Sequence, residues 1–199
     1  ATLSAQGQHG LPGGASGDPV YGYFAFDASA SWRDGALRHL PILPGNGAFA
    51  TVVHELGHGL GLAHPHEVSA GSHIFRGYSD ETPKGIYGLN TKLNTVMSYN
   101  PSDVMGHGGN PVSFMAFDIA ALQHMYGANW DYHRGNDSYE LNDNRMWKSI
   151  WDAAGPDDQI VYKGDKDVVI DLRAAPLTGP HAGGYATKIV GGNSGYTIA

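Results

Sequence analysis

Cysteine is missing from this chain of 199 residues. Disulfide bonds and thiolate metal sites are therefore excluded, so any metal ion has to be held by histidine, tyrosine or carboxylate side chains. Charged residues make up only 16%, with 12 Lys and Arg against 19 Asp and Glu, and they form no basic stripe. A nucleic-acid surface is not expected from such a composition. A membrane partner is not expected either, because no apolar run is long enough to cross a bilayer.

Glycine is abundant, with 29 residues, and indicates many turns rather than a helical bundle. The first 19 residues are predicted to form a flexible lead-in without the pattern of a signal peptide. The aromatic and β-branched stretch VYGYFAF over 20–26 predicts a strand.

Two helices are predicted. The first covers residues 48–60, where one stripe gathers the apolar side chains of Phe49, Val52, Val53, Leu56 and Leu60. The second covers residues 113–126, with Ser113 as its N-cap and Gly127 as its C-terminal stop.

After residue 129 the pattern changes to short β-like runs separated by turn residues. These runs cover residues 159–163, 167–172 and 186–190, and the tail has no obvious closing element. We therefore predict an α+β fold with a boundary near residue 130, dividing a catalytic part over 1–130 from a β-rich part over 131–199.

The strongest motif is HELGHGLGLAH over residues 54–64. His54 and His58 lie four residues apart, so they project from the same side of a helix. Imidazoles bind zinc well, and a catalytic zinc site keeps one position open for water. Glu55 follows the first histidine and is a candidate general base. Because glycine tolerates positive φ, Gly61 lets the chain turn back so that His64 completes a three-histidine zinc site.

This pattern resembles the metzincin zinc endopeptidases. Pro65 after the third histidine and TVMSY over 95–99 resemble the serralysin branch, and SFMAFDIAALQHMYGAN over 113–129 resembles the helix that closes its catalytic domain. The resemblance implies one catalytic zinc ion bound by His54, His58 and His64, with Glu55 as the base. It also implies a turn containing Met97 beneath the metal, and Tyr99 as an additional zinc ligand that stabilises the charged intermediate. Without the family, Met97 is a core methionine and Tyr99 a half-buried tyrosine.

The strand over 20–26 has two interpretations. The resemblance implies an edge strand, including Tyr23, Phe24 and Ala25, that pairs with extended substrate. The alternative is a core strand.

The resemblance also implies a structural calcium ion. Its side-chain ligands would be Asp137, Asp152 and Asp157, and its carbonyl ligands those of His133, Gly135 and Ala154. Calcium binds six to eight oxygens of this kind. Solvated aspartates in turns are the alternative. The calcium-binding repeats of a β-roll are not found in the sequence, so the β-rich part is expected to lead towards such a domain.

Only 53 residues precede His54, which is short for a metzincin domain. The resemblance therefore implies a chain truncated at both ends: a proteolytic fragment, an expression product, a partial sequence or a divergent short form. Candidate partners are a polypeptide substrate, a separate N-terminal fragment that completes the sheet, and a proteinaceous inhibitor.

Two functions remain open. The first is a secreted, extracellular zinc endopeptidase of the serralysin type. The second is a non-catalytic zinc- and calcium-binding fragment or pseudo-protease, which keeps the ligands without the activity. A calcium-stapled structural module, as a third class, needs the repeats that the sequence lacks.

Overall fold

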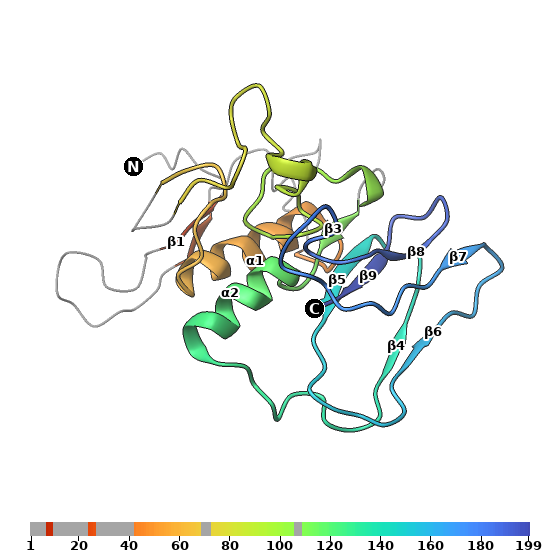
Figure 1. Ribbon diagram of the computed structural model, residues 1–199. Coiled ribbons are helices and arrows are strands. Elements are labelled where there is room, and N and C mark those ends of the chain that lie inside the picture. Colours follow the sequence, from red (N-terminus) through yellow and green to blue (C-terminus); the bar gives the residue numbers. More distant parts are fainter. Residues whose placement is uncertain (1–6, 10–23, 27–41, 69–72, 106–108) are drawn as a thin grey trace.

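The computed structural model describes residues 7–9, 24–26, 42–68, 73–105 and 109–199 (Figure 1). This part of the chain is mixed α/β. Its helices are α1 (Gly47–Gly59) and α2 (Ala116–Tyr126), with short 3-10 turns over Ile86–Gly88 and Asp103–Met105. Among these residues, no helix is long and apolar enough to cross a membrane.

Helix α1 confirms the predicted helix over 48–60. Asn46 caps its start, because the Asn46 side chain accepts a hydrogen bond from the Phe49 amide at 2.8 Å. The predicted apolar stripe is partly wrong. Leu56 is 42% exposed, whereas His54 and Glu55 are less than 10% exposed. The side of α1 that carries the histidines is thus turned into the molecule, because other segments of the chain cover it.

Helix α2 begins at Ala116, so the prediction of Ser113 as its N-cap is wrong. The Ser113 hydroxyl instead donates to the Phe114 carbonyl at 2.9 Å. The start of α2 is stabilised by Asp118, whose carboxylate accepts from the Met115 amide at 2.9 Å. Gly127 ends the helix with φ of +84°, as predicted.

The main sheet has five strands in the order β3-β5-β9-β8-β7 (Figure 1). Its strands are β3 (Asn110–Pro111), β5 (Met146–Ile150), β7 (Val168–Val169), β8 (Thr187–Ile189) and β9 (Gly195–Ile198). The pairs β3–β5 and β5–β9 are parallel, whereas β9–β8 and β8–β7 are antiparallel. A separate parallel pair joins β4 (Ser138–Glu140) to β6 (Gln159–Val161).

Strand β9 corrects the expectation of a tail without a closing element. Its residues pair with Trp147–Ile150 of β5, so the end of the chain lies inside the sheet. The predicted runs over 159–163, 167–172 and 186–190 contain the shorter strands β6, β7 and β8. Strands as short as these carry little alternation, which is why β3, β4, β5 and β9 were not predicted.

A two-stranded antiparallel sheet pairs β1 (Gly7–His9) with β2 (Phe24–Phe26). Strand β1 corrects the expectation that residues 1–19 form only a flexible lead-in. Tyr23 lies outside the described residues, and Phe24 and Ala25 belong to β2. The role of this strand as a substrate-binding edge stays a prediction.

The hydrophobic core connects α1 to the sheet. Val53 of α1 packs in one cluster with Met97, Met115 and the fully buried Trp147 of β5. Burying a large aromatic side chain such as Trp147 contributes strongly to stability. The core therefore contains residues from both sides of residue 130. The division into parts over 1–130 and 131–199 stays a prediction. The expectation that the β-rich part leads towards a β-roll domain also stays a prediction.

Candidate metal centre

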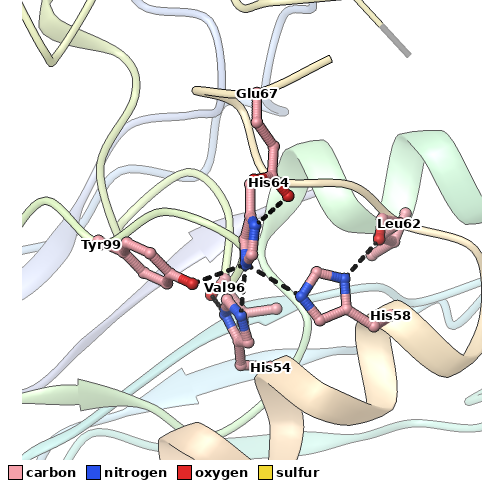
Figure 2. Close-up of polar contacts among 7 residues, drawn as sticks. All are labelled: His54, His58, Leu62, His64, Glu67, Val96 and Tyr99. Atoms are coloured by element: carbon pink, nitrogen blue, oxygen red, sulfur yellow. Dashed lines mark hydrogen bonds and ion pairs between the residues drawn. The ribbon is translucent and has the colours of Figure 1, made fainter. Parts of the chain in front are cut away.

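The three histidines of the motif meet at one point (Figure 2). His64 Nε2 lies 3.0 Å from His54 Nε2 and 3.0 Å from His58 Nε2, and the Tyr99 hydroxyl lies 2.9 Å from the same nitrogen. His54 and His58 come from adjacent turns of α1, and His64 comes from the segment that follows it. One nitrogen of each ring thus faces the same small space.

The other nitrogen of each ring has a hydrogen-bond acceptor (Figure 2). His54 Nδ1 lies 2.8 Å from the Val96 carbonyl, His58 Nδ1 lies 2.9 Å from the Leu62 carbonyl, and His64 Nδ1 lies 2.6 Å from Glu67 Oε1. With Nδ1 donating in each case, the three Nε2 atoms carry lone pairs, and lone pairs that face each other repel.

This donor set fits a tetrahedral metal ion. Three ligands at the zinc–nitrogen distance of ~2.05 Å are separated from each other by ~3.3 Å, close to the nitrogen separations found here. Hydrogen bonds from the outer nitrogens to acceptors are also the arrangement that orients histidine ligands at metal sites. The residues present therefore fit zinc, and the assignment of the zinc ligands stays a prediction.

Burial lowers the pKa of two of these imidazoles. It lowers the pKa of His54 to about 4, although the hydrogen bond to Val96 opposes this change. Burial also lowers the pKa of His64, against the opposing effect of the hydrogen bond to Glu67. A lowered pKa keeps both rings neutral at neutral pH, and the neutral ring is the form that ligates metal.

Gly61 is the reason that His64 reaches the other two histidines. Its φ is +93°, as the prediction of a turn at this glycine requires. The Leu62 amide donates to the Gly57 carbonyl and the Gly61 amide to the His58 carbonyl, both at 2.9 Å. This pair of bonds closes the helix with a Schellman motif. The reversal leaves the Leu62 carbonyl next to His58 Nδ1.

Gly61→Ala should destabilise the chain. A Cβ at Gly61 would have room, since its nearest neighbour is Met125 Sδ at 3.8 Å. The loss arises from the backbone, because a left-handed conformation costs an L-residue about 1–2 kcal/mol. Urea unfolding measures the effect, with Gly47→Ala as the control because nothing lies within 4 Å of that Cβ. Equal midpoints for wild type and Gly61→Ala would contradict this account of the turn.

The turn after Leu93 contacts His54 of the candidate metal centre and is itself held in place by other residues. Met97 is 2% exposed and packs in the core with Val53. The Val96 amide donates to Asp118 Oδ2 at 2.8 Å, and the Thr95 hydroxyl donates to Asp118 Oδ1 at 2.5 Å. Asp118 of α2 thereby holds the segment whose Val96 carbonyl orients His54.

Two supporting residues were not identified from the sequence. Glu67 follows His64 by three residues, and Asp118 is a single charge inside the otherwise apolar run FMAFDIAAL. A lone carboxylate in an apolar helix is a usable signal, because such a group is buried only with partners. Two of its three partners, Thr95 and Val96, however, lie more than 20 residues away in the chain.

Glu55 and Tyr99 differ in their exposure. Glu55 is 7% exposed and lines a cavity together with His54 and Tyr99. Tyr99 is 60% exposed. Partial burial raises the pKa of Tyr99, and the nearby carboxylates of Glu67 and Glu55 raise it further. Its phenol therefore stays protonated at neutral pH and remains a hydrogen-bond donor.

The predicted calcium ligands are only partly brought together. His133, Asp137 and Asp152 have side-chain ligand atoms within 4.8 Å of one another. His133 Nδ1 lies 2.8 Å from Asp137 Oδ1, and the Tyr139 hydroxyl donates to Asp152 at 2.6 Å.

The remaining predicted calcium ligands make other contacts. Asp157 accepts a long hydrogen bond from Asn136 instead, and the His133 carbonyl accepts from the Ala154 amide at 3.4 Å. The Gly135 carbonyl lies against Gly155. The calcium site stays a prediction.

No family model matches the chain. Its sequence is 34% identical to a serralysin from Proteus mirabilis over 146 residues, which cover 65% of this chain and 29% of that protein. It is 36% identical to serralysin C from Dickeya chrysanthemi over 126 residues, covering 54% and 25% of the two chains. Metalloprotease AprA from Pseudomonas entomophila is 29% identical over 171 residues, covering 72% and 34%. In these alignments the chain spans about a quarter to a third of the length of the curated relatives that it matches.

Proposed function

The chain is a relative of the serralysin-type metalloproteases, and on that premise we propose that it is a zinc-dependent endopeptidase acting on extracellular polypeptides. The observation that carries the proposal is the convergence of the three Nε2 atoms while each Nδ1 is engaged by an acceptor. Two histidines that merely lie on one helix do not require such an arrangement. A bound metal ion does.

His54, His58 and His64 would hold the zinc ion. When bound, zinc supplies a Lewis acid for the scissile carbonyl and lowers the pKa of a water molecule. Glu55, buried beside His54, accepts a proton from the attacking water and passes it to the leaving amine. Tyr99, with its protonated phenol next to His64, donates a hydrogen bond to the developing oxyanion.

Removal of the metal tests this proposal. We expect the purified chain to contain one zinc ion, to hydrolyse casein, to lose that activity with 1,10-phenanthroline and to regain it on addition of zinc. Elemental analysis and release of casein peptides are the measurements. A chain that binds zinc without cleaving casein would be the non-catalytic metal-binding protein instead. A chain without zinc affinity would contradict both functions.

A further inference from the structure

A cavity of about 300 Å³ opens beside the candidate metal centre. Ala50, Thr51, His54 and Glu55 of α1 form one side of it, and Lys92 and Tyr99 form part of the other. The proposed general base, the first metal ligand and the proposed oxyanion donor therefore share one space with a lysine. A peptide positioned for hydrolysis would place a side chain next to its scissile bond in or near this space.

Backbone hydrogen bonds hold the segment that carries Lys92. The Lys92 amide donates to the Asn100 carbonyl at 2.9 Å, and the neighbouring Leu93 is buried in the core. The Thr95 amide donates to the Thr91 carbonyl at 3.1 Å, which closes the turn around it. The position of the lysine relative to α1 is thus fixed by the same segment that holds Val96 and Met97.

The ammonium group of Lys92 is only partly solvated. The side chain is of intermediate exposure, and burial lowers its pKa. Within the described part of the chain, no carboxylate forms an ion pair with Lys92, whereas Lys84, Lys163 and Lys166 each have one. A partly desolvated charge without an ion-pair partner is unfavourable, and a ligand carboxylate would relieve that cost.

We propose that Lys92 is a specificity residue, which selects peptide substrates with an aspartate or glutamate beside the scissile bond. This inference rests on the proposed function, and it adds the class of substrate. The acidic side chain would enter the cavity and pair with the ammonium group, while Glu55 would act on the attacking water. A general electrostatic role for Lys92, acting on Glu55 or His54, would instead affect every substrate equally.

Matched peptides distinguish these roles. Three peptides of identical sequence would carry Glu, Gln or Lys at one position next to the scissile bond, in two series for the two sides of that bond. In one series we expect wild type to prefer Glu over Gln by about tenfold in kcat/KM, the size of effect that one partly buried charge pair supplies. We expect Lys92→Met to cleave the Glu and Gln peptides equally and Lys92→Glu to prefer the Lys peptide. Lys163→Met is the control, because Lys163 is 76% exposed and does not line this cavity.

The outcomes separate the two proposals. Cleavage of all three peptides at equal rates in both series, or an equal loss for all three in Lys92→Met, would overturn the specificity role and leave the endopeptidase intact. If no peptide is cleaved, the endopeptidase fails, and peptide binding decides the inference. Fluorescence anisotropy with the zinc-loaded chain should then show tighter binding of the Glu peptide than of the Gln peptide, and equal binding would overturn the inference.

Discussion

Glu55→Gln should retain zinc and lose nearly all hydrolysis of casein. Glutamine has almost the same shape as glutamate, so the packing of this 7%-exposed side chain and the three histidines should remain in place. The amide cannot accept a proton at neutral pH, and the contribution of a general base is typically 10²–10⁴-fold. We therefore expect kcat to fall by about a thousandfold with a zinc content of one per chain.

The matched control is Glu81→Gln, which makes the same chemical change at an exposed site. Its activity should equal that of wild type. Parental activity in Glu55→Gln would refute the proposed role of Glu55. Loss of zinc together with activity would instead mean that the substitution damages the metal site, and that role would have no support.

Asp118→Ala should produce the largest loss of stability among these variants. Asp118 is 2% exposed, and its carboxylate accepts hydrogen bonds from the Thr95 hydroxyl and from the amides of Val96 and Met115. Alanine leaves three buried donors without an acceptor, and each such donor costs about 1–3 kcal/mol. We expect the free energy of unfolding to fall by at least about 3 kcal/mol in urea titrations.

The same variant should bind zinc more weakly. The Val96 carbonyl orients His54, and Asp118 holds the Val96 amide. Loss of groups that orient a ligand costs about 10–100-fold in metal affinity. Asp103→Ala is the control for removal of an aspartate, because the Asp103 side chain is 94% exposed. Unfolding midpoints of Asp118→Ala within error of that control would contradict the supporting role.

Asp118→Asn adds a test by pH. Burial raises the pKa of Asp118 from its ordinary 3.8 to about 6, so the folded chain holds this proton more tightly than the unfolded chain does. A carboxyl group with a raised pKa contributes most stability below its ordinary pKa and loses that contribution as the pH rises through the folded value. The stability of wild type relative to Asp118→Asn should therefore decrease between pH 4 and pH 6. A difference that is constant over this range would contradict the raised pKa.

Most residues of the candidate metal centre could be predicted from the sequence because the motif is local. His54, Glu55 and His58 lie within five residues of one helix, so helical geometry alone places them on adjacent turns. The turn at Gly61 could be predicted for the same reason, since a positive φ after a helix is a property of a few neighbouring residues. Tyr99 came from the resemblance, and its approach to His64 spans 35 residues of sequence.

Several strands, and the residues that hold the candidate metal centre in place, could not be predicted from the sequence in this way. Strand β9 exists because it pairs with β5, almost 50 residues earlier in the chain. The burial of Asp118 likewise depends on its hydrogen bonds with Thr95 and Val96. The place of Lys92 in the cavity depends on the residues of α1 that line the same cavity. Ser113 was a reasonable N-cap by residue type, but tertiary contacts moved the helix start to Ala116.

The sequence by itself determined the candidate chemistry of this protein: histidines as candidate metal ligands in a chain without cysteine, a glutamate beside them, and a glycine that turns the chain back. Only the tertiary structure decided how that chemistry is held. The Val96 carbonyl next to His54 Nδ1, the carboxylate beneath Val96 and the lysine in the adjacent cavity come from segments that approach each other in space. The physical reason is that helix periodicity and turn conformation act over a few residues, whereas burial and hydrogen bonding of polar groups depend on the whole packed chain.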